Sequence, residues 1–430
     1  MNKVAFYTLG CKVNQYETEA MEEIFEKNNY TIVKDDEIAD IYVINTCTVT
    51  NLSDRKSRQF ISRAKKLNKD AIIAVVGCYS QVSPDEVSGI EGVDVIIGTT
   101  DRNRILELCE KAKDKDEKIN IVRNIKTQKE FETINIDDIK SKTRAYIKIQ
   151  DGCNQFCSYC IIPYARGPIR SRGLDEILKE TKKLADAGFK EVVLTGIHVA
   201  SYGKDIDKTP LTKVLEKVGK VEGIERIRLS SLEPTLIDED FMKTVVEIGK
   251  VCDHFHLSLQ SGSDTVLKRM NRKYTTTEYK NIVKLIRKYM PSAGITTDII
   301  VGFPGETDDE FNETMKFVRE IGFSRIHVFK YSPRRGTPAA KFDNQVDGNI
   351  KNIRSESLIA LGEELMLEFH SKFINSTLSV LFEEKCKKDK GSIEGYTTNY
   401  IRVKSKQELN MIGEIVDVTI RSMKNDFLLG

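Results

Sequence analysis

Residues 151–160 read Asp-Gly-Cys-Asn-Gln-Phe-Cys-Ser-Tyr-Cys, and this short stretch decides how the rest of the chain is interpreted. It places three thiols, Cys153, Cys157 and Cys160, within eight residues, in the spacing C-x3-C-x2-C. A loop of this kind can supply three thiolates to a cubane iron–sulfur cluster. The missing fourth thiolate leaves one iron open to a substrate or cofactor, whereas electron carriers usually close that position with a further cysteine.

Two other interpretations of this loop are a zinc site and a set of inert cysteines. Structural zinc usually takes four Cys or His ligands. The next such residues along the chain are His198 and Cys252, and neither is nearby in the sequence. The spacing therefore favours the cluster.

Three further cysteines, Cys11, Cys47 and Cys78, each follow an apolar run. Their separations, 47 − 11 = 36 and 78 − 47 = 31 residues, match one strand–helix–strand unit each. In an open parallel sheet the carboxyl ends of the strands share one edge, so these thiols could meet there. The alternative is three separately buried structural cysteines, since free Cys is often buried. Cys109, Cys252 and Cys386 lack such a setting and are interpreted as ordinary residues.

The N-terminal part, residues 1–113, alternates apolar runs with charged amphipathic stretches. The runs lie at residues 4–9, 41–44, 71–76 and 93–97, and helices are predicted at 17–27 and 53–66. This alternation predicts an α/β domain with a parallel sheet. Residues 114–138 are rich in Lys, Asp and Glu and are predicted to form a charged, solvated linker.

The central part, residues 139–370, repeats the strand–helix pattern six times and ends in a helix at 349–370. Strands are predicted at residues 145–149, 191–194, 226–229, 255–259, 297–301 and 325–329, and helices at 174–187, 211–218 and 308–321. Six units are too few for an eight-fold barrel, so we expect a partial (β/α)6 barrel. Residues 371–430 predict short strands at 378–382, 395–403 and 415–420, a small β-barrel of a type that commonly binds nucleic acid.

Composition limits the partners. The 430 residues carry 67 Lys and Arg and 65 Asp and Glu, a net charge of +2, so bulk charge does not drive nucleic-acid binding. No apolar run approaches the roughly 18 residues of a membrane helix, and no signal peptide is recognised. We therefore expect a cytoplasmic protein without membrane or DNA partners. Its nine cysteines are expected to be reduced thiols rather than a disulfide framework.

The cysteine motifs resemble a known family. Residues 151–167, from Asp151 to Gly167, resemble the signature of the radical S-adenosylmethionine (SAM) superfamily, and the stretches around Cys11, Cys47 and Cys78 resemble the N-terminal domain of its methylthiotransferases. The segments 195–203, 260–263 and 302–307 fit the same family, and the tail resembles a TRAM domain, a small RNA-binding β-barrel. The resemblance covers nearly the whole chain.

The resemblance implies two 4Fe–4S clusters. Cys153, Cys157 and Cys160 would hold the radical-SAM cluster, whose electron cleaves SAM, and Cys11, Cys47 and Cys78 would hold an auxiliary cluster that presents sulfur. One SAM would donate the methyl group and another the radical. The electron would come from a donor such as flavodoxin or ferredoxin.

Candidate SAM contacts follow from the predicted ends of barrel strands, where a ligand can approach the backbone. They are Gly196, Ser231, Glu233, Gly302 and Phe303. Each of these could equally be an ordinary loop residue. We assign no catalytic residue outside the clusters.

Candidate RNA contacts are the arginines after the cluster loop and groups in the tail. They are Arg166, Arg170, Arg172, Tyr396 and Arg402. A second basic group follows Cys47 on a predicted helix: Arg55, Lys56, Arg58, Arg63, Lys65 and Lys66. Phosphate neutralisation and base stacking are the functional interpretations, and a solvated helix face and barrel packing are the alternatives.

Within the family, the segments at residues 10–18 and 47–58 look most like the branch that modifies N6-threonylcarbamoyladenosine (t6A) at position 37 of tRNA, beside the anticodon. The alternatives are methylthiolation of isopentenyladenosine in tRNA, methylthiolation of a ribosomal-protein aspartate, and a non-catalytic iron–sulfur RNA-binding protein. No P-loop, zincin or Ser/His/Asp order is present. None of the five histidines stands in a ligand-like pair in the sequence, and His254 and His256 are interpreted as packing or hydrogen-bonding residues.

Overall fold

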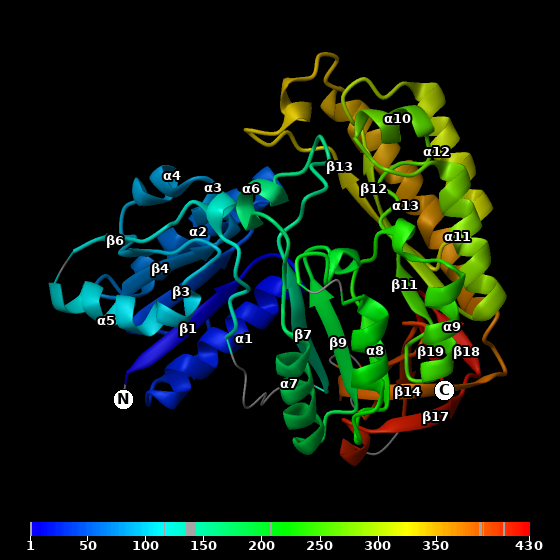
Figure 1. The fold of residues 1–430 in the computed structure, drawn as a ribbon, viewed down its shortest axis with the longest axis horizontal. Helices are drawn as coiled ribbons and strands as arrows, with labels where there is room; N and C mark the ends of the chain where they lie inside the picture. Colours follow the sequence, from blue (N-terminus) through cyan, green and yellow to red (C-terminus); the bar gives the residue numbers. More distant parts are fainter. Residues whose placement is uncertain are drawn as a thin grey trace.

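The computed structural model describes residues 2–115, 117–134, 143–206, 209–386, 389, 391–406 and 409–430. Figure 1 shows three parts: an N-terminal sheet with its helices in blue and cyan, a curved barrel in green and yellow, and a C-terminal β-structure in orange and red beneath the barrel. The strands of the barrel lie between the other two parts. This arrangement confirms the predicted α/β fold class.

The N-terminal sheet is parallel throughout and has the order β2-β1-β3-β4-β5-β6. Its strands are β1 (Lys3–Thr8), β2 (Thr31–Val33), β3 (Ile41–Thr46), β4 (Ile72–Gly77), β5 (Val95–Ile96) and β6 (Ile119–Asn120). Its helices are α1 (Lys12–Lys27), α2 (Asn51–Leu67), α3 (Cys78–Val82), α4 (Pro84–Ser88) and α5 (Ile105–Lys115). Phe25 of α1 is buried in the apolar layer on one face and Phe60 of α2 in the layer on the other, so both faces of the sheet are covered.

The segment predicted to be a charged linker is packed in its described part. Its residues 119–120 form the edge strand β6, and Ile125 and Ile134 are buried. The Glu132 carboxylate forms an ion pair with the Arg102 guanidinium group, with an N–O distance of 2.6 Å. A few apolar side chains and one buried ion pair among many charges are enough to fix this segment, which composition alone does not reveal. Residues 116 and 135–142, including the end of the predicted linker, lie outside the described residues.

The barrel consists of two sheets whose facing edges are joined by single bridges. The strands are β7 (Arg144–Asp151), β8 (Arg170–Ser171), β9 (Glu191–Gly196), β10 (Arg226–Leu229), β11 (His254–His256), β12 (Gly294–Val301) and β13 (Arg325–Lys330). Except for the antiparallel edge strand β8, all pairs are parallel. Bridges Ile227↔Val251 and Leu232↔Leu257 connect β10 to the segment around β11. The predicted partial barrel is therefore confirmed.

The strand predicted at residues 255–259 is shorter than expected. β11 ends at His256, although Leu257 and Leu259 continue inward and are fully buried. The Thr297 hydroxyl donates to the Leu257 carbonyl at 2.5 Å and accepts from the Leu259 amide at 3.0 Å. A side chain thus satisfies backbone groups that a ladder would otherwise pair.

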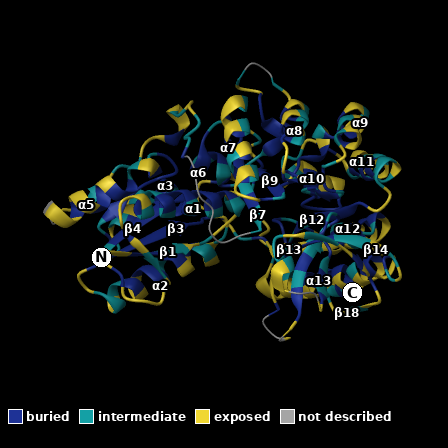
Figure 2. Cartoon of the chain, turned by 90° about the horizontal axis from the view of Figure 1, so that it is seen from below, coloured by how far each residue is buried: buried dark blue, intermediate teal, exposed yellow. Residues whose placement is uncertain are grey.

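Helices cover the outside of the barrel, and Figure 2 shows their exposed outer faces in yellow over a buried interior in blue. They are α6 (Ile162–Arg166), α7 (Leu174–Asp186), α8 (Leu211–Gly219), α9 (Glu239–Ile248), α10 (Asp264–Arg269), α11 (Thr276–Tyr289), α12 (Asp308–Ile321) and α13 (Gly348–Ser371). On β13, Ile326 and Val328 pack toward the core under α13, whereas the alternate residues Arg325 and His327 are exposed. The inner side of this last strand is therefore open to solvent.

The C-terminal sheet has the order β17-β14-β15-β16-β19-β18 around its own apolar core. Its strands are β14 (Thr377–Lys385), β15 (Ile393–Thr397), β16 (Arg402–Ser405), β17 (Ile415–Thr419), β18 (Ser422–Lys424) and β19 (Phe427–Leu429). Its turn between β15 and β16 contacts the barrel: Arg228 donates to the carbonyls of Thr397 at 3.1 Å and Thr398 at 2.9 Å. The turn therefore closes the end of the barrel at which its parallel strands begin.

Across the described part of the chain, the helices are all too short or too polar to cross a lipid bilayer.

Candidate functional site

The loop after β7 presents three thiols from one short, firmly held segment. Gly152 has φ +74°, and a Cβ there would lie 1.8 Å from the Pro168 carbonyl oxygen, so only glycine fits this turn. The Cys153 amide donates to the Gly167 carbonyl at 3.0 Å, and the Ser158 amide donates to the Met270 carbonyl at 3.0 Å. Backbone hydrogen bonds on both sides therefore fix the loop.

The electrostatics of this loop call for positive charge. Burial, with a smaller contribution from the neighbouring thiols, raises the pKa of Cys153 to about 11 and of Cys160 to about 12. Arg272 approaches the loop with one guanidinium nitrogen 3.3 Å from Cys157 Sγ, and another donates to Glu233 at 2.8 Å. Metal cations would supply the remaining charge that thiolates need here.

The second trio is assembled by the N-terminal sheet. Cys11 caps α1 after β1, Cys47 follows β3, and Cys78 begins α3 after β4, so all three lie at the carboxyl ends of neighbouring parallel strands. A Cβ on Gly10 would lie 3.0 Å from Cys47 Cβ. Burial raises the pKa of Cys78 to about 12, and the Cys47 and Cys11 thiols raise it as well. The structure therefore brings these three cysteines together, as their spacing predicts.

The sulfur spacing bears on which metal each trio fits. A single tetrahedral zinc ion, with Zn–S bonds of about 2.3 Å, needs sulfurs only about 3.8 Å apart. Among the described residues, the group of His, Cys, Asp and Glu whose ligand atoms all lie within 4.8 Å of one another contains no cysteine. Both trios are thus more widely spaced than a single zinc ion requires, which fits a larger cluster.

A group of buried, ion-paired side chains joins the N-terminal sheet to the barrel beside the second trio. Arg166 is fully buried, donates to Glu17 at 2.5 Å, and lies 3.3 Å from Cys78 Sγ through Nε. Glu17 also accepts from Arg102 at 2.5 Å and from Lys148 at 2.8 Å. Burial alone would raise the pKa of Glu17, but these cations outweigh it and lower the pKa to about 2. The carboxylate is therefore held ionised.

The three arginines predicted as RNA contacts belong to this interior. Arg166, Arg170 and Arg172 are 0–2% exposed. Arg170 donates to the Arg166 carbonyl at 2.9 Å and lies 3.5 Å from Asp151, while Arg172 pairs with Glu180. Because their guanidinium groups are buried and partnered, these arginines hold the interior together and are not presented to a phosphate backbone. By contrast, Arg55, Lys56, Arg63 and Lys66 are exposed on α2.

A cavity of about 470 Å³ opens where the three parts of the molecule meet. Its lining residues come from the start of α1, from the inner side of the barrel strands, and from the turn of the C-terminal sheet: Gly10, Cys11, Lys12, Val13, Thr195, Gly196, Ser230, Ser231, His254, His256, Thr296, Asp298, Arg325, His327, Tyr396 and Tyr400. One cavity thus reaches a thiol of the second trio and the strand ends of the barrel.

The predicted SAM contacts separate into three places. Gly196 and Ser231 line this cavity. Glu233 lies beside the cluster loop through Arg272, and 3.6 Å from His198. Gly302 has φ +69° and donates its amide to Glu306 at 2.7 Å, while Phe303 is fully buried against Tyr331 and Phe342. Gly302 and Phe303 therefore do not line the cavity.

Sequence reasoning missed two features. The first is Arg272, which follows α10 and joins Cys157 to Glu233. The second is a group formed by His256, Asp298 and His327, whose ligand atoms all lie within 4.8 Å of one another. Asp298 on β12 pairs in register with His327 on β13. Alternation of polar residues in the segments 254–256, 296–298 and 325–327, at or beside the strands predicted at 255–259, 297–301 and 325–329, was the available signal, because alternate residues of a strand share one face.

The candidate RNA contacts of the tail lie close to the barrel. Tyr396 stacks on Tyr400, with ring centroids 4.8 Å apart, and Tyr400 stacks on His254 of β11 at 4.7 Å. Both tyrosines line the cavity. Arg402 pairs with Asp426 at 2.8 Å. In this structure the tyrosines form the floor of the cavity.

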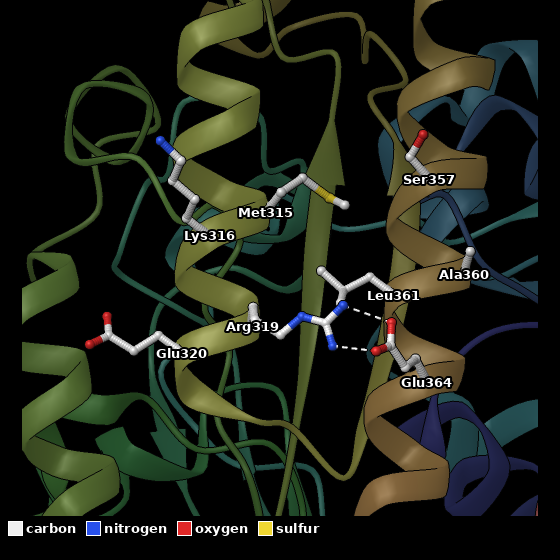
Figure 3. Close-up of a pocket in the computed structure, with 8 residues that line it drawn as sticks. All are labelled: Met315, Lys316, Arg319, Glu320, Ser357, Ala360, Leu361 and Glu364. Atoms are coloured by element: carbon white, nitrogen blue, oxygen red, sulfur yellow. Dashed lines mark hydrogen bonds and ion pairs between the residues drawn. The ribbon is translucent and has the colours of Figure 1, made fainter.

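A larger hollow of about 620 Å³ lies elsewhere, on the outside of the barrel between α12 and α13. Figure 3 shows Arg319 of α12 reaching across it to Glu364 of α13, a paired contact of 2.6 Å. The hollow is open and lined by helix surface residues, and none of the six motif cysteines is among them. We assign the chemistry to the cavity beside the thiols.

Comparisons with known proteins agree with this geometry. The model of the radical SAM superfamily matches residues 147–318, and the model of an uncharacterized protein family, UPF0004, matches residues 3–98. The chain is 46% identical to "Threonylcarbamoyladenosine tRNA methylthiotransferase MtaB" of Bacillus subtilis, over 98% of this chain and 94% of the relative. The chain belongs to the methylthiotransferase family of radical SAM enzymes. The predicted family is thereby confirmed.

Other relatives of this methylthiotransferase carry two different names. An Aquifex aeolicus protein with the same MtaB name is 40% identical over 97% of this chain and all of its own length. A "tRNA-2-methylthio-N(6)-dimethylallyladenosine synthase" of Alkaliphilus oremlandii is 36% identical over 97% of this chain and 90% of its own length. Among solved structures, a radical SAM methyltransferase, TsrM, from Kitasatospora setae matches with a TM-score of 0.58 at 15% identity, over 79% of this chain and 77% of the other, which supports the fold alone.

Membership of the family makes the chain an enzyme that transfers alkylthio groups, and it implies SAM and a 4Fe–4S cluster. The alternative of a non-catalytic iron–sulfur protein is therefore set aside. The thiols of the loop after β7, two buried and one half-buried, fit such a cluster by donor type and by spacing.

Proposed function

We propose that this methylthiotransferase adds a methylthio group to carbon 2 of t6A at position 37 of tRNA. The observation that carries the proposal is the cavity, since it connects Cys11 of the second trio with Gly196 and Ser231 at the barrel strand ends. A substrate base in this cavity would lie between the place of SAM and the place of a sulfur-presenting group.

In this proposal Cys153, Cys157 and Cys160 hold the radical-SAM cluster, and Cys11, Cys47 and Cys78 hold an auxiliary cluster. When bound, the clusters supply the one-electron chemistry that cleaves one SAM and the sulfur that receives a methyl group from another. The protein contributes binding, orientation and the exclusion of water.

The residues around each trio have defined positioning roles in this scheme. Arg272 links Cys157 to Glu233, so it fixes the cluster loop relative to the end of β10, where SAM is expected. Arg166 links Cys78 to Glu17 of α1 and so fixes the second trio against the barrel. Both guanidinium groups are buried and place a permanent positive charge beside a cysteine of each trio, and that of Arg166 opposes the rise in the pKa of Cys78 that burial causes.

The partner in this proposal is the tRNA anticodon loop, approached along α2. Its exposed cations, Arg55, Lys56, Arg63 and Lys66, are on the helix that follows Cys47 and could neutralise phosphates. The target adenine must leave its stack to enter the cavity. A flavodoxin or ferredoxin is proposed as the electron donor.

The choice of t6A rests on the relatives and on the cavity. The relatives at 46% and 40% identity carry the threonylcarbamoyladenosine name, whereas three dimethylallyladenosine synthases are 36–38% identical, as is a third relative with the threonylcarbamoyladenosine name at 36%. The polar, cationic lining of the cavity also suits a charged substituent better than an isopentenyl group. Methylthiolation of isopentenyladenosine is the second candidate, and modification of a ribosomal-protein aspartate is the third.

The deciding experiment is nucleoside mass spectrometry of tRNA from a strain lacking this gene, before and after the gene is restored. We expect 2-methylthio-t6A to disappear in the deletion strain, t6A to accumulate, and the methylthio product to return on complementation. Loss of the methylthio form of isopentenyladenosine instead would establish the second candidate.

A further inference from the structure

The cavity has an inner chamber with an unusual balance of charge. We define the inner chamber by Lys12, His256, Asp298, Arg325 and His327, all of which line the cavity. His256 lies 3.3 Å from Asp298, so the one carboxylate among the lining residues has a partner. Lys12 and Arg325 are the lysine and arginine of the chamber, and no ion pair joins either of them to a described residue. The Asp298 carboxylate thus has an imidazole beside it, whereas Lys12 and Arg325 have no ion-pair partner.

The surroundings of Lys12 add to this imbalance. Tyr400 lies at the floor, and its ring receives the guanidinium groups of Arg144 at 5.4 Å and Arg228 at 4.8 Å. Arg228 is paired with Glu191 at 2.7 Å, and Arg144 is paired with Glu383 at 2.8 Å. The acidic groups near the floor are therefore committed to those arginines and leave Lys12 without a carboxylate partner.

Two buried polar atoms of lining residues also lack partners. They are the hydroxyl oxygen of Ser230 and Nδ1 of His254, in residues that are 6% and 5% exposed. Neither atom is itself accessible from the cavity, so the indication of a polar, negatively charged ligand comes from the two cationic side chains that have no ion-pair partner.

We propose that the inner chamber recognises the carboxylate-bearing substituent on N6 of the target adenine, with Lys12 and Arg325 binding the carboxylate. This inference rests on the proposed function and names the group by which the enzyme selects its substrate. The imidazole of His327 lines the same space and offers a hydrogen bond to a hydroxyl or carbonyl group of the substituent. An isopentenyl group in the chamber would leave both cations unpaired, which is a penalty that rejects it.

The test compares two anticodon stem–loop RNAs that differ only at this carboxylate. One carries t6A, and the other carries its methyl ester, which has the same shape without the charge. We expect the anaerobically reconstituted holoenzyme to bind the acid about 10- to 100-fold more tightly than the ester, as one charge-assisted hydrogen-bonded contact provides. Fluorescence anisotropy measures both affinities without turnover.

The variants locate the preference. Lys12→Met should lose most of the preference for the acid, with the affinity for the ester unchanged, and Lys12→Arg should retain most of the preference. Arg325→Met, at an exposed position that tolerates substitution, should reduce the preference on its own. Lys182→Met, on the exposed outer face of α7, is the matched control and should bind like the wild type. Iron content is measured in each, because Lys12 follows Cys11.

The outcomes are distinguishable. If the wild type binds acid and ester equally yet restores 2-methylthio-t6A in the deletion strain, the inference is wrong and the proposed function stands. The inference is also wrong if the equal affinities accompany a tightly bound metal ion at His256, Asp298 and His327 that a chelator removes. If complementation restores only the isopentenyl product, the proposed function fails and the inference fails with it. An acid preference that Lys12→Met and Arg325→Met each reduce supports the inference.

Discussion

The two cysteine trios contrast in how the chain assembles them. Cys153, Cys157 and Cys160 lie on one loop whose geometry is fixed by local hydrogen bonds, so their meeting needs few residues. Cys11, Cys47 and Cys78 meet only because three parallel strands end at one edge of a sheet. The first trio is a property of a motif and the second is a property of a fold.

The geometry of each trio therefore depends on different contacts. A loop trio depends on its own turn, such as the glycine at 152, whereas a sheet-edge trio depends on every contact that sets the sheet against the barrel. The buried charges around Glu17 and Arg166 are such contacts, since Arg166 joins α1, the barrel and Cys78. Substitutions at the two trios should therefore differ in their effects on activity, iron content and the free energy of unfolding.

The largest effect is expected from Cys157→Ala. Losing one thiolate of the loop removes the radical-SAM cluster, so cleavage of SAM and methylthio transfer should both fall below detection. Production of 5′-deoxyadenosine under reducing, anaerobic conditions measures the first, and nucleoside mass spectrometry measures the second. Normal cleavage of SAM by this variant would contradict the assignment of the loop.

Cys47→Ala should abolish methylthio transfer but not the cleavage of SAM. We expect SAM cleavage to continue, methylthio transfer to stop, and iron to fall from about eight to about four per chain, because one 4Fe–4S cluster is lost. The same two assays and an iron determination test this. A Cys47→Ala enzyme that makes the methylthio product at the wild-type rate would remove the second trio from the mechanism.

Glu17→Gln should affect stability more than ligation. Removing one partner from a buried ion-pair cluster leaves uncompensated cations and costs about 3–5 kcal/mol in the free energy of unfolding. The pKa of Glu17 is lowered to about 2 from its ordinary 4.5, so its stabilisation is present above pH 4.5 and is lost as the pH falls toward 2. Urea unfolding at pH 7 and at decreasing pH measures both effects. Equal stability of the variant and wild type at pH 7 would show that the cluster is not stabilising.

The smallest effect is expected from Cys109→Ala. Cys109 lies on the buried face of α5, in the apolar layer between this helix and the sheet, and belongs to neither trio. The substitution should leave iron content and both activities unchanged and cost only about 1 kcal/mol through lost packing. A drop in iron in this variant would mean that the division of the cysteines into ligands and ordinary residues is wrong.

The sequence predicted most of the sheet framework because strands and helices alternate with clear periodicity. The barrel strand at residues 226–229 has the predicted limits, and the N-terminal strands follow the apolar runs. Local spacing made the loop trio evident. The edge strand β6 and the short β2 were not foreseen, since each has at most three residues and little pattern of its own.

The cavity was harder to predict, for a physical reason. Which side chains share it depends on register between strands far apart in sequence, such as Asp298 opposite His327, and on contacts between the three parts. Arg166, Arg170 and Arg172 were predicted to contact RNA because of their charge. Arginine is equally common in buried ion pairs with carboxylates, and the sequence does not distinguish the two settings. Tyr400 enters the barrel through a turn whose left-handed backbone, φ +69°, has no signal in composition.

That turn has a consequence for how the enzyme can be dissected. Arg226 and Arg228 donate to the carbonyls of Tyr396, Thr397 and Thr398, so the barrel relies on the tail's backbone to satisfy two guanidinium groups. A variant truncated after residue 370 would lose Tyr396 and Tyr400, which form the floor of the cavity, together with any RNA contacts that the C-terminal sheet makes. Its failure to act could not be credited to weaker tRNA binding, and point changes on the outer surface of the tail are the cleaner way to weigh that contribution.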